Sequence, residues 1–203
     1  MAIIDHLTLD VPDTAAAKQF YATAFDLDES RLRLRAGDEP STGFRGYTLS
    51  LTVSQPSTVD SFVQSALDAG ATTLKPAEKS LWGYGGVVQA PDGAIWKVAT
   101  SAKKDTGPAT RQVDDLVLLL GAEDVTASKR FYADHGVAVS KSFGRMYVEF
   151  ESGKAVKLGL YRRRALAKAA GVSPEGTGSH RITISGDAGP FTDPDGFTWE
   201  NTR

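Results

Sequence analysis

Apolar and polar residues alternate along several short segments, and each of these is followed by a stretch with helical periodicity. IIDHLTLDV at residues 3–11 alternates with period two, which predicts a half-buried strand. PDTAAAKQFYATAF at 12–25 begins with cap-competent residues and spaces its apolar side chains as a helix does. The same order of strand, acidic cap and helix returns in VDDLVLLLGAEDVTASKRFYADHG at 113–136. The pattern therefore predicts an internal repeat.

A second kind of unit follows the first strand and helix. GYTLSLTV reads as a strand, TVDSFVQSALDAG as an amphipathic helix, and ATTLKP, GGVVQA and AIWKVA as three short strands. Its counterpart near the end is shorter, because SHRITIS passes almost directly into GPFTDPDGFTWE. A hairpin from MYVEFE and VKLGLY and a short helix in RRRALAKAAG precede this shortened unit.

A Pro-Asp-Gly turn followed two residues later by Trp occurs in both halves. The copies read APDGAIWKVA at 90–99 and DPDGFTWENT at 193–202, and Lys97 and Glu200 follow the two Trp residues. We interpret the chain as two diverged halves, 1–101 and 113–203, joined by a polar linker at 102–112. Helices segregated against largely antiparallel strands predict an α+β fold, with the first and last modules abridged.

Composition excludes several classes of function. The 203 residues contain no cysteine, which removes disulfides and thiolate metal sites. A net charge of -2 does not indicate a basic surface of the kind that binds nucleic acid. No apolar run approaches the ~18 residues that a membrane span needs, and charges near the start argue against a signal peptide. We therefore expect a cytoplasmic protein with neither nucleic acid nor membrane as partner.

The order and spacing of these motifs give a family resemblance. Each half has HLTLDV-PD or its counterpart, then a helix ending in FY, a strand, AGA in the first half, and PDG-x-x-W followed by Glu or Lys. In this order and spacing the chain resembles the vicinal oxygen chelate superfamily, in its glyoxalase/bleomycin-resistance/dioxygenase group. The resemblance covers nearly the whole chain and appears twice. It implies tandem βαβββ modules that form open, curled mixed sheets with helices outside. The sheets would cradle a small organic molecule, in many members beside a divalent metal.

The resemblance also implies where ligands lie: on the first strand of each module and at a Glu just after the PDG-x-x-W motif. In the first half these positions hold His6, Thr48 and Lys97. A protonated lysine cannot coordinate a metal, so we expect these residues to bind an organic ligand instead. Lys97 would then attract an anionic group of the ligand.

In the second half the same positions hold a set that suits a hard divalent metal. Asp115 takes the first position, or Val117 if the register is anchored on the FY pair, and His180 and Glu200 take the others. Asp, His and Glu suit Mn, Fe, Zn or Ni, so this half is the candidate for one metal ion.

Two large aromatic residues stand among glycines in Trp82-Gly-Tyr84-Gly-Gly. They would either stack on a planar ligand or pack locally around a turn that glycine permits. We include Trp82 and Tyr84 among the candidate ligand-binding residues.

Two functions follow. The first is a glyoxalase/bleomycin-resistance-like protein that binds a small organic molecule in a sheet-lined cavity and has a largely degenerate metal site. The alternative is a metal-dependent lyase, isomerase or dioxygenase that uses Asp115, His180 and Glu200. The fold hosts both kinds of activity, so no catalytic residue is assigned. The chain is expected to be a monomer or a homodimer.

Overall fold

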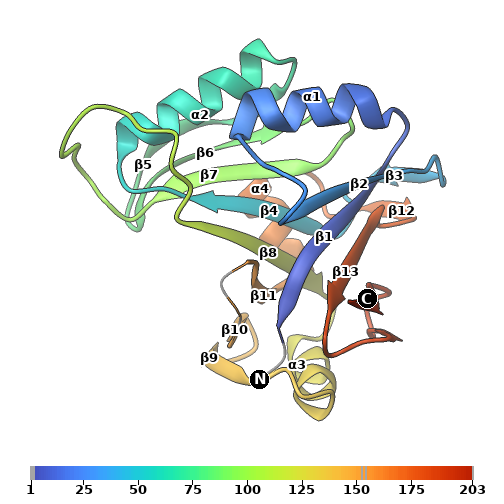
Figure 1. Ribbon diagram of the computed structural model, residues 1–203. Coiled ribbons are helices and arrows are strands. Elements are labelled where there is room, and N and C mark those ends of the chain that lie inside the picture. Colours follow the sequence, from blue (N-terminus) through green and yellow to red (C-terminus); the bar gives the residue numbers. More distant parts are fainter. Residues whose placement is uncertain (1–2, 152, 154, 203) are drawn as a thin grey trace.

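The computed structural model describes residues 3–151, 153 and 155–202, and in them two large sheets pack around a shared core (Figure 1). The first half forms β1 (Ile4–Val11), α1 (Thr14–Phe25), β2 (Leu32–Ala36), β3 (Ser41–Gly43), β4 (Tyr47–Thr52), α2 (Pro56–Asp68), β5 (Thr72–Ser80), β6 (Gly83–Gln89) and β7 (Ile95–Thr100). The second half forms β8 (Asp115–Ala122), α3 (Val125–Asp134), β9 (Val139–Phe143), β10 (Tyr147–Phe150), β11 (Lys157–Arg162), α4 (Arg163–Ala170), β12 (Gly176–Gly178), β13 (Ile182–Gly186), β14 (Phe191–Thr192) and β15 (Thr198–Asn201). The predicted α+β class is confirmed.

The smaller of the two sheets joins the beginning of the described chain to its end. Its strand order is β14-β15-β13-β1-β2, and β1 runs antiparallel to β13 and parallel to β2. Figure 1 shows β1 and β13 side by side. The last module is abridged as expected: in the described residues a turn and the short β14 stand between β13 and β15, with no helix.

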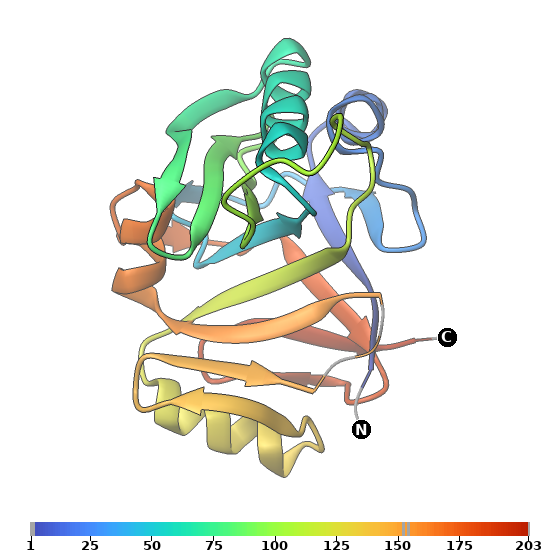
Figure 2. The ribbon, with the colours of Figure 1, turned by 90° about the vertical axis from the view of Figure 1, so that its left-hand side faces the viewer.

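The larger sheet also combines both halves. Its order is β5-β6-β7-β4-β8-β11-β10-β9, and the halves meet where β4 runs antiparallel to β8. Figure 2 shows the second-half strands continuing this sheet below those of the first half. Each large sheet therefore takes one module from each half, and the strands of one half alone complete neither sheet.

One apolar cluster holds the two sheets together. Alternate residues of the central strands, among them Leu7, Leu9, Leu49 and Leu118, are almost fully buried in it. Burial of each such side chain stabilises the fold by roughly 1.5–3 kcal/mol. Helices α1 and α2 lie side by side on one side of the molecule, and α3 lies at the opposite end (Figure 1). The remaining face of each sheet is free to carry polar residues.

The repeated FY and PDG-x-x-W motifs join in space. The Tyr21 hydroxyl on α1 donates to Asp92 of the first PDG turn at 2.6 Å, and the Trp96 indole lies 3.4 Å from the same hydroxyl. In the second half, the Tyr132 hydroxyl on α3 donates to Asp193 at 2.7 Å, and the Trp199 indole donates to it at 3.2 Å.

These contacts explain why the two motifs recur together. Helix α1 follows a strand of the small sheet but contacts Trp96 on the large sheet, and α3 follows a strand of the large sheet but contacts Trp199 on the small one. Each Tyr–Trp–Asp group therefore ties one sheet to the other.

Candidate functional site

The pleat of β1 decides which side chains face away from the core. Leu7 and Leu9 point into the apolar cluster, so His6 and Asp10 belong to the opposite face of the small sheet. On that face His6 lies opposite Ser185 of β13, and Ser185 lies opposite Glu200 of β15. His6, Ser185 and Glu200 thus form one row across three strands.

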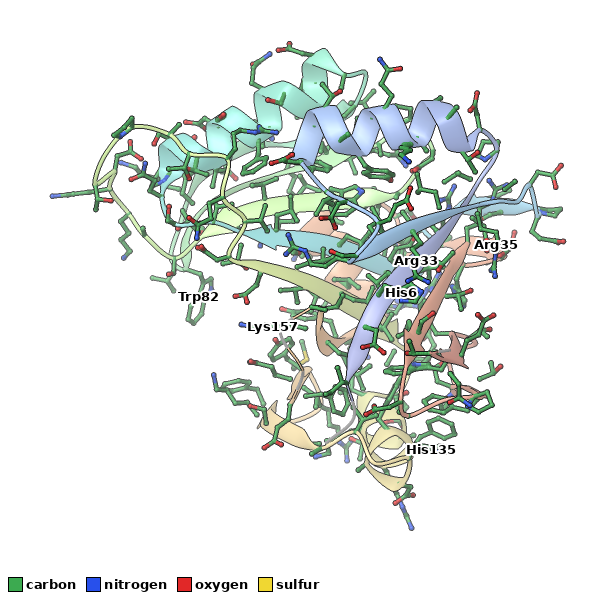
Figure 3. All side chains as sticks on the ribbon, viewed as in Figure 1. His6, Arg33, Arg35, Trp82, His135 and Lys157 are labelled. Carbon is green, nitrogen blue, oxygen red and sulfur yellow. The ribbon has the colours of Figure 1, made fainter. Side chains whose placement is uncertain are left out.

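This row lines a pocket of about 580 Å³, which we call the His6 pocket. Its lining residues are His6, Arg33, Ser185, Pro190, Glu200, Asn201 and Thr202. Arg33 comes from β2, and Figure 3 shows it next to His6. Imidazole, guanidinium, hydroxyl and carboxylate groups therefore meet in a single concave site.

His6 is the most enclosed ionisable group of this pocket. Its side chain is only 6% exposed, and its ring nitrogens form no hydrogen bond with any described residue. Burial, and next the positive charge of Arg33, lower the pKa of His6, although Asp5 and Glu200 oppose this. The imidazole is therefore neutral at pH 7, with one nitrogen available to donate a hydrogen bond and the other to accept one.

The two arginines beside the pocket differ in their partners. Arg35 pairs with Asp10 at 2.7 Å, donates to Thr183 at 3.1 Å and lies 3.9 Å from Glu200. Arg33 forms no ion pair within the described part of the chain, and its Nε reaches only a backbone carbonyl at 3.4 Å. Arg33 is thus the cation of this face that is available to an anionic group.

The corresponding face of the large sheet carries lysines instead. Strand register places Lys97, Ser50, Val117 and Lys157 in one row across β7, β4, β8 and β11. Lys157 pairs with Asp115 at 2.8 Å. The Ser50 hydroxyl is buried and lacks a hydrogen-bond partner among the described residues.

Helix α4 covers part of this face. Its Leu166 and Ala170 pack with Val87 and Ile95 of the large sheet in a second, smaller apolar cluster. Lys75 of β5 donates a hydrogen bond to the carbonyl of Lys168 near the end of α4, at 2.9 Å.

The candidate ligand-binding residues are distributed over three parts of the molecule. His6 lies in the pocket of the small sheet, whereas Thr48 and Lys97 lie on the polar face of the large sheet. Tyr84 points to the face of the large sheet that α2 covers, where its hydroxyl donates to Asp60 of α2 at 2.7 Å. This hydrogen bond raises the pKa of Tyr84 to about 12. Trp82 is 84% exposed at the turn between β5 and β6 (Figure 3).

The candidate metal ligands do not come together. Asp115 lies on the large sheet and Glu200 on the small one, and His180 precedes β13. The His180 ring nitrogens face the backbone carbonyls of Arg45 at 2.6 Å and Asp195 at 3.0 Å, so the ring bridges two loops.

The donor sets of the two rows do not fit a divalent metal. The large-sheet row offers two lysines, a serine and a valine, and the small-sheet row offers only His6 and Glu200 as good ligands, with Arg33 close to them. In the described residues no group of three His, Cys, Asp or Glu side chains is arranged to hold a metal.

Sequence reasoning missed Arg33, Ser185 and Lys157. The register anchored on the FY pair, which selects Val117, is the one that matches the row facing Lys97. On β4 the residue opposite Lys97 is Ser50, not the expected Thr48. Arg33 lies in an abridged module, where the motifs offer no anchor.

Comparison with known proteins supports the fold. No protein-family model matches the sequence, and a search of curated proteins finds no match. Among solved structures, a glyoxalase I variant from Zea mays superposes with a TM-score of 0.64 at 13% identity, covering 98% of this chain and 93% of that one. A second Zea mays glyoxalase I variant gives 0.62 at 15% identity, covering 99% and 92%.

A protein from Bacillus subtilis, proposed to be a dioxygenase, gives a TM-score of 0.54 at 11% identity, with 90% of this chain and 69% of that chain covered. No helix in the described residues has the length and apolar character of a membrane span. At sequence identities of 11–15%, what these three solved structures share with this chain is the fold, that is, the arrangement of its modules and sheets. The chain therefore has the same fold as these glyoxalase I structures, in agreement with the fold expected from its repeated FY and PDG-x-x-W motifs.

Proposed function

We propose that the protein binds a small organic molecule in the His6 pocket. The observation that carries this proposal is His6 itself, which is buried, neutral and without a hydrogen-bond partner among the described residues while it lines an open pocket. A buried polar group in a folded protein normally has a partner, so an unpartnered one facing a pocket is suited to a ligand.

The groups around His6 indicate the class of ligand. The Arg33 guanidinium suits a carboxylate or phosphate, which it can bind through two parallel hydrogen bonds. The Glu200 carboxylate accepts hydrogen bonds from hydroxyl or amino groups, and the Ser185 hydroxyl both donates and accepts. A small hydroxy acid or amino acid satisfies all of these groups at once.

The metal-dependent alternative has less support. Asp115, His180 and Glu200 lie on separate elements. In the described residues, neither the row of side chains around His6 nor the row around Lys97 brings together three side chains that could hold a metal. The pocket needs no metal to bind an acid, because Arg33 provides the positive charge.

The test is a thermal-shift screen of small hydroxy acids, amino acids and sugar phosphates, followed by calorimetric titration of the best compound. His6→Gln and Arg33→Met should each weaken its binding at least about tenfold, which equals 1.4 kcal/mol. The matched controls are His135→Gln and Arg130→Met, because Arg130 on α3 and His135 at its C-cap are both exposed and neither lines the pocket. Unchanged affinity in His6→Gln, or no compound that binds in the millimolar range, would overturn the proposal.

A further inference from the structure

Three lysines lie on the polar face of the large sheet, and they differ in their partners. The ammonium of Lys157 pairs with Asp115 at 2.8 Å. The ammonium of Lys75 donates to a backbone carbonyl near the end of α4 at 2.9 Å. Lys97 stands between them in the row and has neither an ion pair nor a hydrogen bond with any described residue.

The neighbours of Lys97 on this face leave its amine accessible but poorly solvated. Val87 of β6 and Ser50 of β4 are its register partners, one strand away on either side at roughly 4.8 Å. Ile95 lies on the same face two residues earlier, under α4. Lys97 itself remains exposed on its strand. Lys97 is therefore in contact with solvent, while its neighbours on the sheet are mostly apolar and include one hydroxyl without a hydrogen-bond partner among the described residues, that of Ser50.

The electrostatic surroundings of Lys97 favour the free amine and attract anions. Burial, and next the positive charge of Lys75, lower the pKa of Lys97. The same two factors, partial desolvation and a neighbouring cation, convert lysines into nucleophiles in proteins. Only Lys157 among the three has a carboxylate partner in the described residues, so the row keeps excess positive charge.

We propose that Lys97 is a nucleophilic amine that forms an imine with small aldehydes carrying a carboxylate or phosphate. The Nζ lone pair attacks the carbonyl carbon, and the resulting carbinolamine loses water. A C=N bond replaces C=O, the oxygen leaves as water with the two amine protons, and no oxidant or reductant is consumed. This site lies on a different sheet from the His6 pocket and does not depend on it.

The test uses 4-formylbenzoate as the probe and sodium cyanoborohydride to reduce any imine to a stable secondary amine. Intact mass and peptide mapping at pH 7 locate the adduct. Among the lysines of the wild-type protein we expect one fast adduct, on Lys97, because a lowered pKa increases the fraction of the free amine that attacks the aldehyde. Benzaldehyde, which lacks the anionic group, should react more slowly at this position.

Variants separate chemical activation from simple accessibility. Lys97→Arg should abolish the fast adduct, and the control Lys141→Arg, on the same sheet and paired with Glu149, should not. Lys75→Met should slow the reaction of Lys97, because removing the neighbouring charge lets its pKa rise. Labelling spread evenly over the lysines of the wild-type protein would overturn the proposal without any variant having to fold. Equal rates for benzaldehyde and 4-formylbenzoate, or an unchanged rate in Lys75→Met, would also contradict it.

Discussion

Replacing Tyr132 by Phe removes a single oxygen atom from the interior. The Tyr132 side chain is 0% exposed, and its hydroxyl donates to Asp193 at 2.7 Å while it accepts from the Trp199 indole at 3.2 Å. The ring still fits in the variant, so the expected loss comes from hydrogen bonding and not from a cavity.

The size of the loss follows from what stays behind. Asp193 keeps backbone donors from Asp195 and Phe197 on its other carboxylate oxygen, at 2.9 and 2.8 Å. Its Oδ2 loses a donor in a buried position, where a hydrogen bond to a charged group contributes about 1.5–3 kcal/mol. The Trp199 indole also loses its acceptor. We expect the free energy of unfolding to fall by about 3 kcal/mol, which lowers Tm by roughly 6–12 °C in a chain of this size.

Tyr21→Phe is the matched control, because Tyr21 makes the same pair of contacts in the first half. Asp92 is only partly buried, and the Trp96 indole lies 3.4 Å away, so the loss should be smaller, about 2 kcal/mol. Urea unfolding followed by circular dichroism and Trp fluorescence measures both variants. A loss under about 0.5 kcal/mol for Tyr132→Phe, or a larger loss for Tyr21→Phe, would refute the assigned role of these hydroxyls.

Three further predictions concern charge. Because the pKa of His6 is lowered in the folded state, the unfolded chain binds the proton more readily, so the free energy of unfolding should fall as pH drops through the ordinary value of 6.5. In His6→Gln the urea midpoint should lose this part of its pH dependence. Urea midpoints that change with pH in the same way in both proteins would contradict the prediction. Lys157→Met should reduce stability by less than about 1 kcal/mol, because its ion pair with Asp115 is partly exposed; a larger loss in the same titration would show that the pair is structurally essential. Protein grown with Mn, Fe, Zn and Ni should contain no stoichiometric metal by mass spectrometry; a metal that Glu200→Gln releases would restore the metal-dependent alternative.

Local pattern was enough to predict most elements. The strand at 3–11, the two helices that carry FY, and the short helix in RRRALAKAAG all lie close to their expected bounds. Each of these depends on periodicity and caps within a dozen or so residues, such as Asp13 accepting from the backbone of Ala16.

The composition of the site could not be predicted in the same way. It depends on which modules pair, and His6 meets Glu200 because β1 pairs with β13 across nearly the whole chain. The sequence pattern treats His6, Thr48 and Lys97 as one group, whereas the strands divide them between two sheets. His180 was expected on a strand, but β13 begins only at Ile182 and presents Ser185 to His6.

The pairing of β1 with β13 also has a consequence for synthesis on the ribosome. The apolar side chains of β1 emerge long before those of its antiparallel partner β13, by roughly 10–40 seconds at ordinary elongation rates. The large sheet needs no strand beyond β11 and is able to form earlier. Until β13 arrives, β1 presents an open edge to other chains, so the nascent protein should depend on chaperones more than its finished fold suggests.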